Sequence, residues 1–352
     1  MKPRQSSIEL LRILAMLMIV SGHFLGQSGL AAAHPSFGMS LASSGARWAC
    51  NLFLIVGCWF LVDAEFNWRR VVKLYLTVIS YTVPLTILAL ACGGHPAMKD
   101  VMRGFLPFTG RALWFASAYI SLMLLTPWLH RVFELPMKSL GLLVGLLTVL
   151  LSGVCTLPDE QMCYAIDCCW FVYVYLAVGW AKRALSEHDC GLWTRRWFKW
   201  ACLVVGLAIY VGLVFLRGHF SGFVATWAGQ CLSDFKTAPN FLSAVLVFAF
   251  FIHCDIGSIG WINRLARPAF AVYVIHQTPA FFPFLWSCVC RVKAWQDSPW
   301  WWVMAIGIVI AVYCVGWLLE SIRSRVPHVG RCPKITFAHS CQTSPSGGTK
   351  AR

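Results

Sequence analysis

The chain has 352 residues, of which 59% are hydrophobic and only 12% are charged, and it carries a formal net charge of +15 at pH 7. A soluble globular domain has about 25% charged residues, so this chain lacks the polar surface that it would need in water. The positive charge does not indicate a nucleic-acid-binding protein, because the cations lie in short clusters between apolar segments.

The first apolar segment runs from about residue 8 to residue 25. It has no small-residue cleavage site, and it contains the ionisable residues Glu9, Arg12 and His23. A secretory signal peptide has a purely apolar central region that ends at such a site. We therefore interpret this segment as a retained first membrane span.

Ten apolar segments approach the length of about 20 residues that a helix needs to cross a bilayer. The sixth is short, and the ninth contains Pro279 and Pro283, which membrane helices tolerate where neighbours satisfy the backbone. The sequence therefore predicts an all-α, polytopic transmembrane helical bundle of about ten spans. The predicted spans cover residues 9–26, 45–63, 72–91, 113–130, 139–155, 168–181, 198–217, 238–254, 268–289 and 300–319.

The distribution of Lys and Arg predicts the orientation of this bundle. With the N-terminus in the cytoplasm, twenty of the 29 cations fall in cytoplasmic segments and eight in outer segments, while Arg12 lies within a span. Positive residues accumulate on the cytoplasmic side of membrane proteins, so we expect both termini there. We predict one transmembrane domain over residues 1–322 and a disordered, basic, cytoplasmic tail over residues 323–352.

The sixteen cysteines include no CxxC pair, and no metal site is predicted. Most of them fit the role of small apolar packing residues. A disulfide in the outer loops is possible, although the sequence does not assign it; the candidates are Cys92, Cys155, Cys163 and Cys231.

Two ionisable side chains share one face of the first predicted span. Arg12 and His23 are eleven residues apart, which is almost three helical turns and about 16 Å along the axis. Ionisable residues within a membrane usually face a bundle interior or a wet cavity and mark function. Alone, Arg12 could reach the headgroups or pair with Glu9, and His23 could make a packing hydrogen bond. Their common face favours a functional role.

Several short motifs follow one another along the chain. They are Arg12 and His23 with ten residues between them, the segment NLFLIVG at 51–57, Arg70-Val-Val-Lys73, Leu113-Trp-Phe115 with Tyr119 and Pro127, and Tyr273-Val-Ile-His276. Together these motifs resemble the membrane acyltransferase-3 family, whose members O-acylate bacterial glycans. Two positions depart from the family pattern. Val56 stands where the family often has Ser, and Lys73 replaces an Arg, which keeps the charge but loses the planar guanidinium fork.

The resemblance implies transfer of an acyl group, acetyl in the simplest case, from acyl-CoA to a hydroxyl of a cell-surface or lipid-linked saccharide at a bacterial plasma membrane. His23 is then the catalytic base, since imidazole titrates near neutral pH. A carboxylate or a backbone group would orient it, and the sequence does not identify which. Arg12 joins it at the catalytic site and, with Arg70 and Lys73, would bind the acyl-CoA. Arg70 and Lys73 also fit a plain cluster of cytoplasmic cations. No permanently bound cofactor is expected.

Tyr273 and His276 share a helix face and are candidates for substrate binding, although His276 equally fits a buried packing role. The alternative function is a transporter or flippase of a lipid-linked glycan or acyl donor. The interruption at Pro279 and Pro283 favours that alternative, and the scarcity of acids within the spans opposes it. The predicted partners are acyl-CoA, a saccharide acceptor and membrane lipids, without nucleic acid. The sequence does not determine the oligomeric state.

Overall fold

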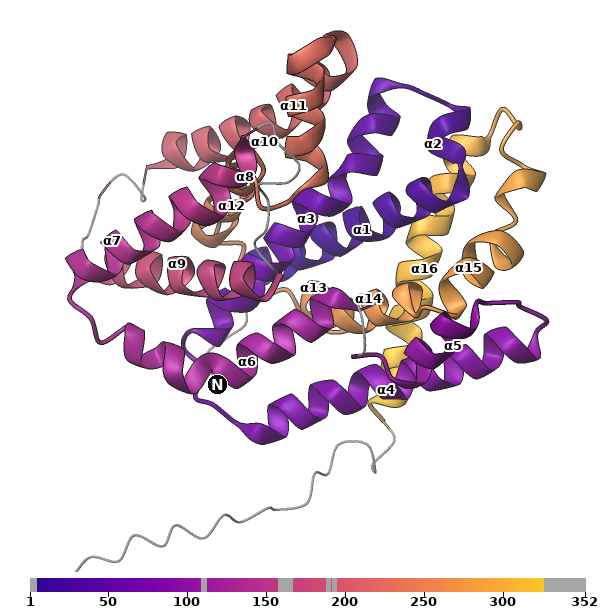
Figure 1. The fold of residues 1–352 in the computed structure, drawn as a ribbon, viewed down its shortest axis with the longest axis horizontal. Coiled ribbons are helices and arrows are strands. Elements are labelled where there is room, and N and C mark those ends of the chain that lie inside the picture. The colour runs from indigo at the N-terminus through magenta and orange to yellow at the C-terminus, as the bar shows by residue number, and fades with distance from the viewer. Residues whose placement is uncertain (1–4, 109–112, 158–166, 188–190, 192–194, 326–352) are drawn as a thin grey trace, which may run out of the picture.

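The computed structural model describes residues 5–108, 113–157, 167–187, 191 and 195–325, and over these ranges it contains helices and no strand (Figure 1). The all-α prediction is therefore confirmed. The helices are α1 (Ser6–Ser28), α2 (Leu30–Ala33), α3 (Phe37–Leu61), α4 (Trp68–Ala91), α5 (Met98–Phe105), α6 (Trp114–Val132), α7 (Met137–Leu147), α8 (Val154–Thr156), α9 (Asp167–Glu187), α10 (Arg196–His219), α11 (Gly222–Ser233), α12 (Ala238–His253), α13 (Gly260–Ala266), α14 (Ala269–Gln277), α15 (Phe281–Phe284) and α16 (Trp301–Arg323), with π-helical turns at Thr148–Gly153 and Leu285–Val289.

Within the described residues, six helical segments are long and apolar enough to cross a membrane. They are α1, α3, α4, α10, α16 and the continuous segment Met137–Thr156, and α11 with α12 makes a seventh if this pair, bent by 51°, counts as one span. Each of the ten predicted spans coincides with helix, so ten spans are compatible with the fold without being established by it. The ninth predicted span is broken beside Pro279, between α14 and α15, because proline has no amide hydrogen to donate to a continuing helix.

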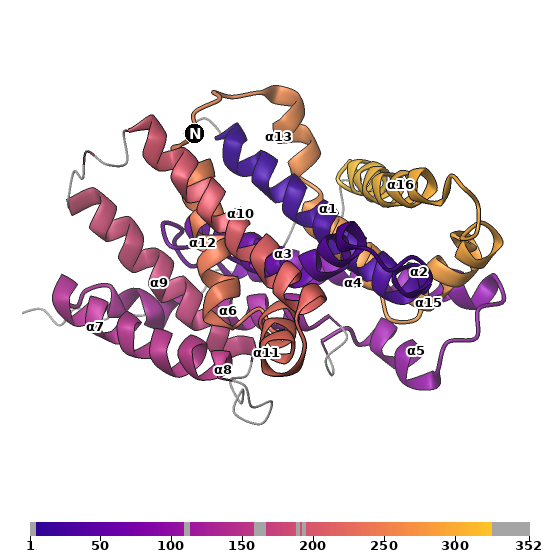
Figure 2. The same cartoon turned by 90° about the horizontal axis from the view of Figure 1, so that it is seen from above.

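Helices α1 and α3 lie side by side at the centre of the bundle, with α7 and α9 on one flank and α15 and α16 on the other (Figures 1 and 2). In the most apolar window of α1 and of α3, 61% of the residues are buried inside the protein, compared with 17% in α16. Helix α16 instead exposes large apolar side chains, including Ile306 and Ile310, as expected of a helix that faces lipid. The inner pair is therefore where polar side chains can be shielded from lipid.

Gly22 allows α1 and α3 to approach closely. A Cβ atom built on Gly22 would lie 2.9 Å from the carbonyl oxygen of Ser43 and would overlap Ala46. Small residues at helix interfaces permit such contacts in membrane proteins. His23 and Arg47 directly follow Gly22 and Ala46 in the sequence, so this contact brings their backbones close together.

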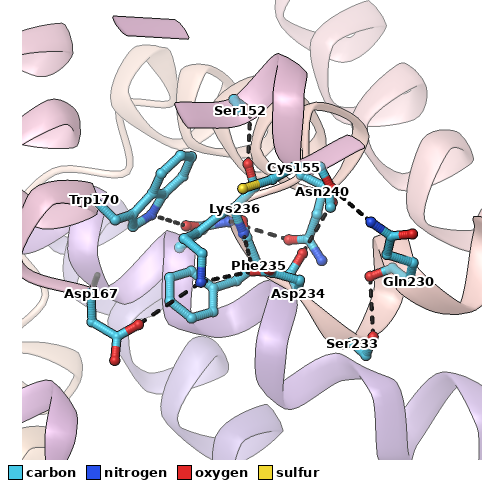
Figure 3. A network of polar contacts seen from close by, with 12 residues as sticks. Ser152, Cys155, Asp167, Trp170, Gln230, Ser233, Asp234, Phe235, Lys236 and Asn240 are labelled. Atoms are coloured by element: carbon cyan, nitrogen blue, oxygen red, sulfur yellow. Dashed lines mark hydrogen bonds and ion pairs between the residues drawn. The ribbon is translucent and has the colours of Figure 1, made fainter. Parts of the chain in front are cut away.

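Buried polar side chains hold the bend between α11 and α12 (Figure 3). The side-chain amide of Asn51 donates to the carbonyl of Phe235 at 2.6 Å, and its oxygen accepts from the indole of Trp170 at 3.2 Å. Ser152 donates to the carbonyl of Lys236 at 2.8 Å. Each of these bonds satisfies a polar group that would otherwise be costly to bury, so the bend is fixed against α3, α9 and the π-helical turn.

The predictions for the cysteines and for the C-terminal tail fall partly on described residues and partly outside them. Cys155 forms a disulfide, whereas Cys92 and Cys231 are free thiols; Cys163 lies outside the described residues. The predicted tail also lies outside them from position 326 onward, so its character stays a prediction.

Candidate active site around His23

One stripe of α1 carries the candidate site. Arg12, Met16, Ile19 and His23 follow one another at intervals of four, three and four residues, which places them on one helix face. Arg12 lines one cavity, and the other three line a second cavity. One face of α1 thus carries a guanidinium toward the N-terminal end of the helix and an imidazole toward its C-terminal end.

The ring of His23 is hydrogen-bonded to a second histidine. His23 Nδ1 lies 3.1 Å from His276 Nε2, and His276 Nδ1 lies 2.6 Å from the carbonyl oxygen of Val272, one turn back along α14. A carbonyl can only accept, so His276 Nδ1 carries a hydrogen. Because His276 is completely buried, its neutral form is favoured, and its Nε2 then accepts from His23 Nδ1. This arrangement leaves His23 Nε2 with a free lone pair.

His23 borders a small cavity of about 60 Å³ between α1, α3, α6 and α14. Among the described residues, Arg47 of α3 is the only permanently charged side chain that lines it, and Tyr273 of α14 adds a phenol. Arg47 also contributes to the protein surface, and it makes no ion pair with a described residue. An imidazole and a guanidinium that has no ion pair among the described residues therefore line the same small cavity.

A second cavity of about 180 Å³ surrounds the other end of the stripe. Two cations, Arg12 and Arg267, line it. Arg12 is held by an ion pair with the buried Glu9 at 2.8 Å and lies over the ring of Phe60. Within the described part of the chain, its lining contains two guanidinium groups and no carboxylate, a composition that suits an anionic group.

Phe53 of α3 and Phe115 of α6 separate the two cavities. Both residues line both cavities, and their rings meet edge to face with centroids 5.7 Å apart. The space at Arg12 and the space at His23 are therefore neighbours divided by two aromatic side chains.

The residues that hold the bend between α11 and α12 also support the wall of the His23 cavity. Trp114 lines this cavity and stacks on Phe235 with ring centroids 5.3 Å apart. Phe235 is held in turn by Asn51, through the carbonyl bond described above. The second-span motif at 51–57 thus supports the site from behind.

The predicted site residues fall at different distances from these cavities. Arg70 and Lys73 are exposed on the first turns of α4 and line neither cavity; Arg70 donates to the carbonyl of Glu65 at 3.3 Å. Leu74, next to Lys73, does line the Arg12 cavity. Tyr273 lines the His23 cavity, whereas His276 lies behind His23 and takes the orienting position that the sequence assigned to a carboxylate or a backbone group.

Arg47 and Arg267 line these cavities without having been predicted. A signal for Arg47 exists, because Arg47, Cys50, Phe53 and Gly57 recur every three or four residues and so share one face of α3. Arg267 has no such signal, since only the tertiary fold brings the junction of α13 and α14 to α1.

Comparison with known proteins agrees with this geometry. A family profile described as "Acyltransferase domain", of the acyltransferase-3 type, matches residues 5–320. No curated protein and no solved structure gives a significant match. The matched range covers the inner helix pair, both cavities and the paired histidines, and it favours the enzyme over the transporter or flippase that the sequence left open. The chain belongs to the membrane acyltransferase-3 family, and it is an acyltransferase of groups other than amino-acyl groups.

Proposed function

We propose that the protein transfers an acyl group, acetyl in the simplest case, from acyl-CoA to a hydroxyl of a cell-surface or lipid-linked saccharide. The observation that carries this proposal is the chain of hydrogen bonds from the Val272 carbonyl through His276 to His23. It orients the ring so that Nε2 of His23 is the general base at the cavity.

The bond changes follow from that geometry. His23 Nε2 takes the proton of the acceptor hydroxyl as its oxygen attacks the thioester carbonyl. The guanidinium of Arg47 stabilises the oxyanion that forms on the carbonyl oxygen. The C–S bond then breaks, the ester remains on the saccharide, and the proton held by His23 passes to the CoA thiolate.

The donor is assigned to the Arg12 cavity. The phosphates of acyl-CoA are anionic, and Arg12 and Arg267 are the cations that line this space. Arg70 and Lys73 are exposed at the start of α4, whose Leu74 lines this cavity, and they would meet the nucleotide end. The thioester arm would pass between Phe53 and Phe115 to reach His23.

The membrane orientation follows the charge distribution. Both termini are assigned to the cytoplasm of a bacterial cell, so the Arg12 end of α1 faces the cytoplasmic donor and the Ser28 end faces outward. Residues 1–322 are assigned to the unit that performs the reaction, and residues 323–352 to a cytoplasmic tail.

Transfer of radiolabelled acetyl from acetyl-CoA to envelope saccharide tests the proposal. Membranes with equal amounts of wild type, His23→Ala and His219→Ala are compared. Loss of a general base lowers the rate by about 10²- to 10⁴-fold, so His23→Ala should lose nearly all labelling. His219 is exposed at the end of α10 and contacts its own helix, so His219→Ala should label as wild type does. Equal labelling by wild type and His23→Ala would exclude His23 as the base.

A further inference from the structure

A third cavity lies beyond the far end of the α1 stripe. It has a volume of about 500 Å³ and lies between Gln27 and Ser28 of α1 and the segment 282–294. Gln27 is four residues after His23 and therefore one turn farther along the same face. Three cavities thus follow one another along α1, at Arg12, at His23 and at Gln27. We refer to the third as the outer cleft, in the orientation proposed above.

The lining of the outer cleft combines positive charge with aromatic surface. Arg291 and Lys293 are exposed cations, and no carboxylate of a described residue lines the cleft. Phe282 and Trp286 supply aromatic rings that pack edge to face. Gln27 and two serines add hydrogen-bonding groups. Apolar rings with a few polar groups are typical of small-ligand sites, and the volume lies within their usual range of about 300–1,000 Å³.

Packing within the bundle and the local backbone conformation fix the positions of the cleft residues. Trp286 is only 3% exposed and packs on the fully buried Phe24 of α1. Its indole Nε1 has no hydrogen-bond partner within the described structure. Arg291 has a backbone φ of +44°, a left-handed conformation that is uncommon for residues other than glycine. Such outliers gather at ligand sites, and this one sets where the Arg291 side chain leaves the backbone.

We propose that the outer cleft binds the acceptor and that the acceptor is an anionic saccharide, one that carries carboxylate or phosphate groups. This inference rests on the acyl transfer proposed above. Guanidinium and ammonium groups recognise carboxylates and phosphates through charge-assisted hydrogen bonds, and the partly exposed ring of Phe282, backed by Trp286, offers an apolar surface to a sugar ring. The position of the cleft, one helical turn beyond the base, brings a bound hydroxyl toward His23.

The proposal is tested, without acyl transfer, by the binding of two saccharide probes of equal length, one charged and one uncharged. Galacturonic acid trimer and galactose trimer are titrated, with no acyl-CoA present, into full-length protein in phosphatidylcholine nanodiscs. We expect wild type to bind the acidic trimer at least tenfold more tightly than the neutral one. Arg291→Gln/Lys293→Gln should remove this preference, and Lys293→Gln alone should reduce it if the double variant does not fold. Lys99→Gln removes an exposed cation from α5 outside the cleft lining, and it should keep the preference.

Equal binding of the two trimers by wild type would overturn the proposal, as would a preference that survives Arg291→Gln/Lys293→Gln. A preference present in phosphatidylcholine but abolished in phosphatidylglycerol nanodiscs would assign the cations to lipid headgroups and also overturn it. The binding experiment involves no acyl transfer and no variant of His23. The labelling experiment on His23 and this binding experiment can therefore fail independently.

Discussion

At the scale of single residues, the two nitrogens of His23 have different partners. Nδ1 is committed to His276, and Nε2 is left for the acceptor. His276 is fixed by a backbone carbonyl, which cannot change its protonation and so holds the tautomer of both rings. His276 is a positioning residue in this account, because it acts on the substrate only through His23.

Replacement of His276 tests whether its hydrogen bond orients His23. His276→Ala removes the acceptor of the His23 Nδ1 hydrogen, and we expect kcat to fall by about 10- to 100-fold, the loss typical when a metal-bound histidine loses its orienting partner, with the KM for acetyl-CoA unchanged. His276→Gln can still accept through its side-chain carbonyl, so it should retain more activity than His276→Ala. Equal losses in both variants would point to a packing role for His276.

Arg47 gives a second residue-scale test. Removing one oxyanion-stabilising donor typically costs about 10²- to 10³-fold in kcat, so Arg47→Gln should lose activity in that range. Arg47→Lys keeps the positive charge without the planar guanidinium fork, so its kcat should fall less than that of Arg47→Gln. Steady-state rates in membranes with matched protein levels provide the measurement, and unchanged kcat in Arg47→Gln would remove Arg47 from the reaction.

At the scale of helices, the site depends on how closely α1 and α3 pack. Gly22 is in contact with Ser43 and Ala46, whereas Gly26, one turn later on α1, has no neighbour within 4 Å of where a Cβ would lie. The two glycines lie on one helix and differ in this contact. They therefore form a matched pair.

Gly22→Val should force the helices apart. Inserting side-chain atoms into a packed contact costs about 1–3 kcal/mol, so we expect a lower melting temperature in detergent together with strongly reduced acyl transfer. Gly26→Val should leave both quantities close to wild type. If both variants have the same melting temperature and the same acyl-transfer rate, the contact at Gly22 has no part in forming the site.

The sequence predicts the helices better than it predicts their breaks. Apolar length places each expected span on a helix, and the stripe of Arg12 and His23 follows from helical periodicity alone. The break in the span over residues 268–289 falls at Pro279, where the sequence made the boundary uncertain. The contact between His23 and His276 was not predictable, because it joins residues 253 positions apart and no local pattern records which helices meet.

At the scale of the whole molecule, α1 lines three separate cavities that follow one another, at Arg12, at His23 and at Gln27. The cations at its first end suit a phosphorylated donor, and the outer cleft suits an acidic saccharide. In the orientation proposed from the charge distribution, the Arg12 end of α1 faces the cytoplasm. Donor and acceptor are therefore expected to approach His23 from opposite faces of the membrane.

The sidedness of the reaction tests this claim most directly. Sealed inside-out vesicles that enclose acidic envelope saccharide are given radiolabelled acetyl-CoA, which does not cross membranes, on their outer surface. We predict that wild type labels the enclosed saccharide, that the label resists an added esterase until detergent opens the vesicles, and that His23→Ala gives no label. Labelling that requires acetyl-CoA on the same side as the saccharide, or that persists in His23→Ala, would contradict the account.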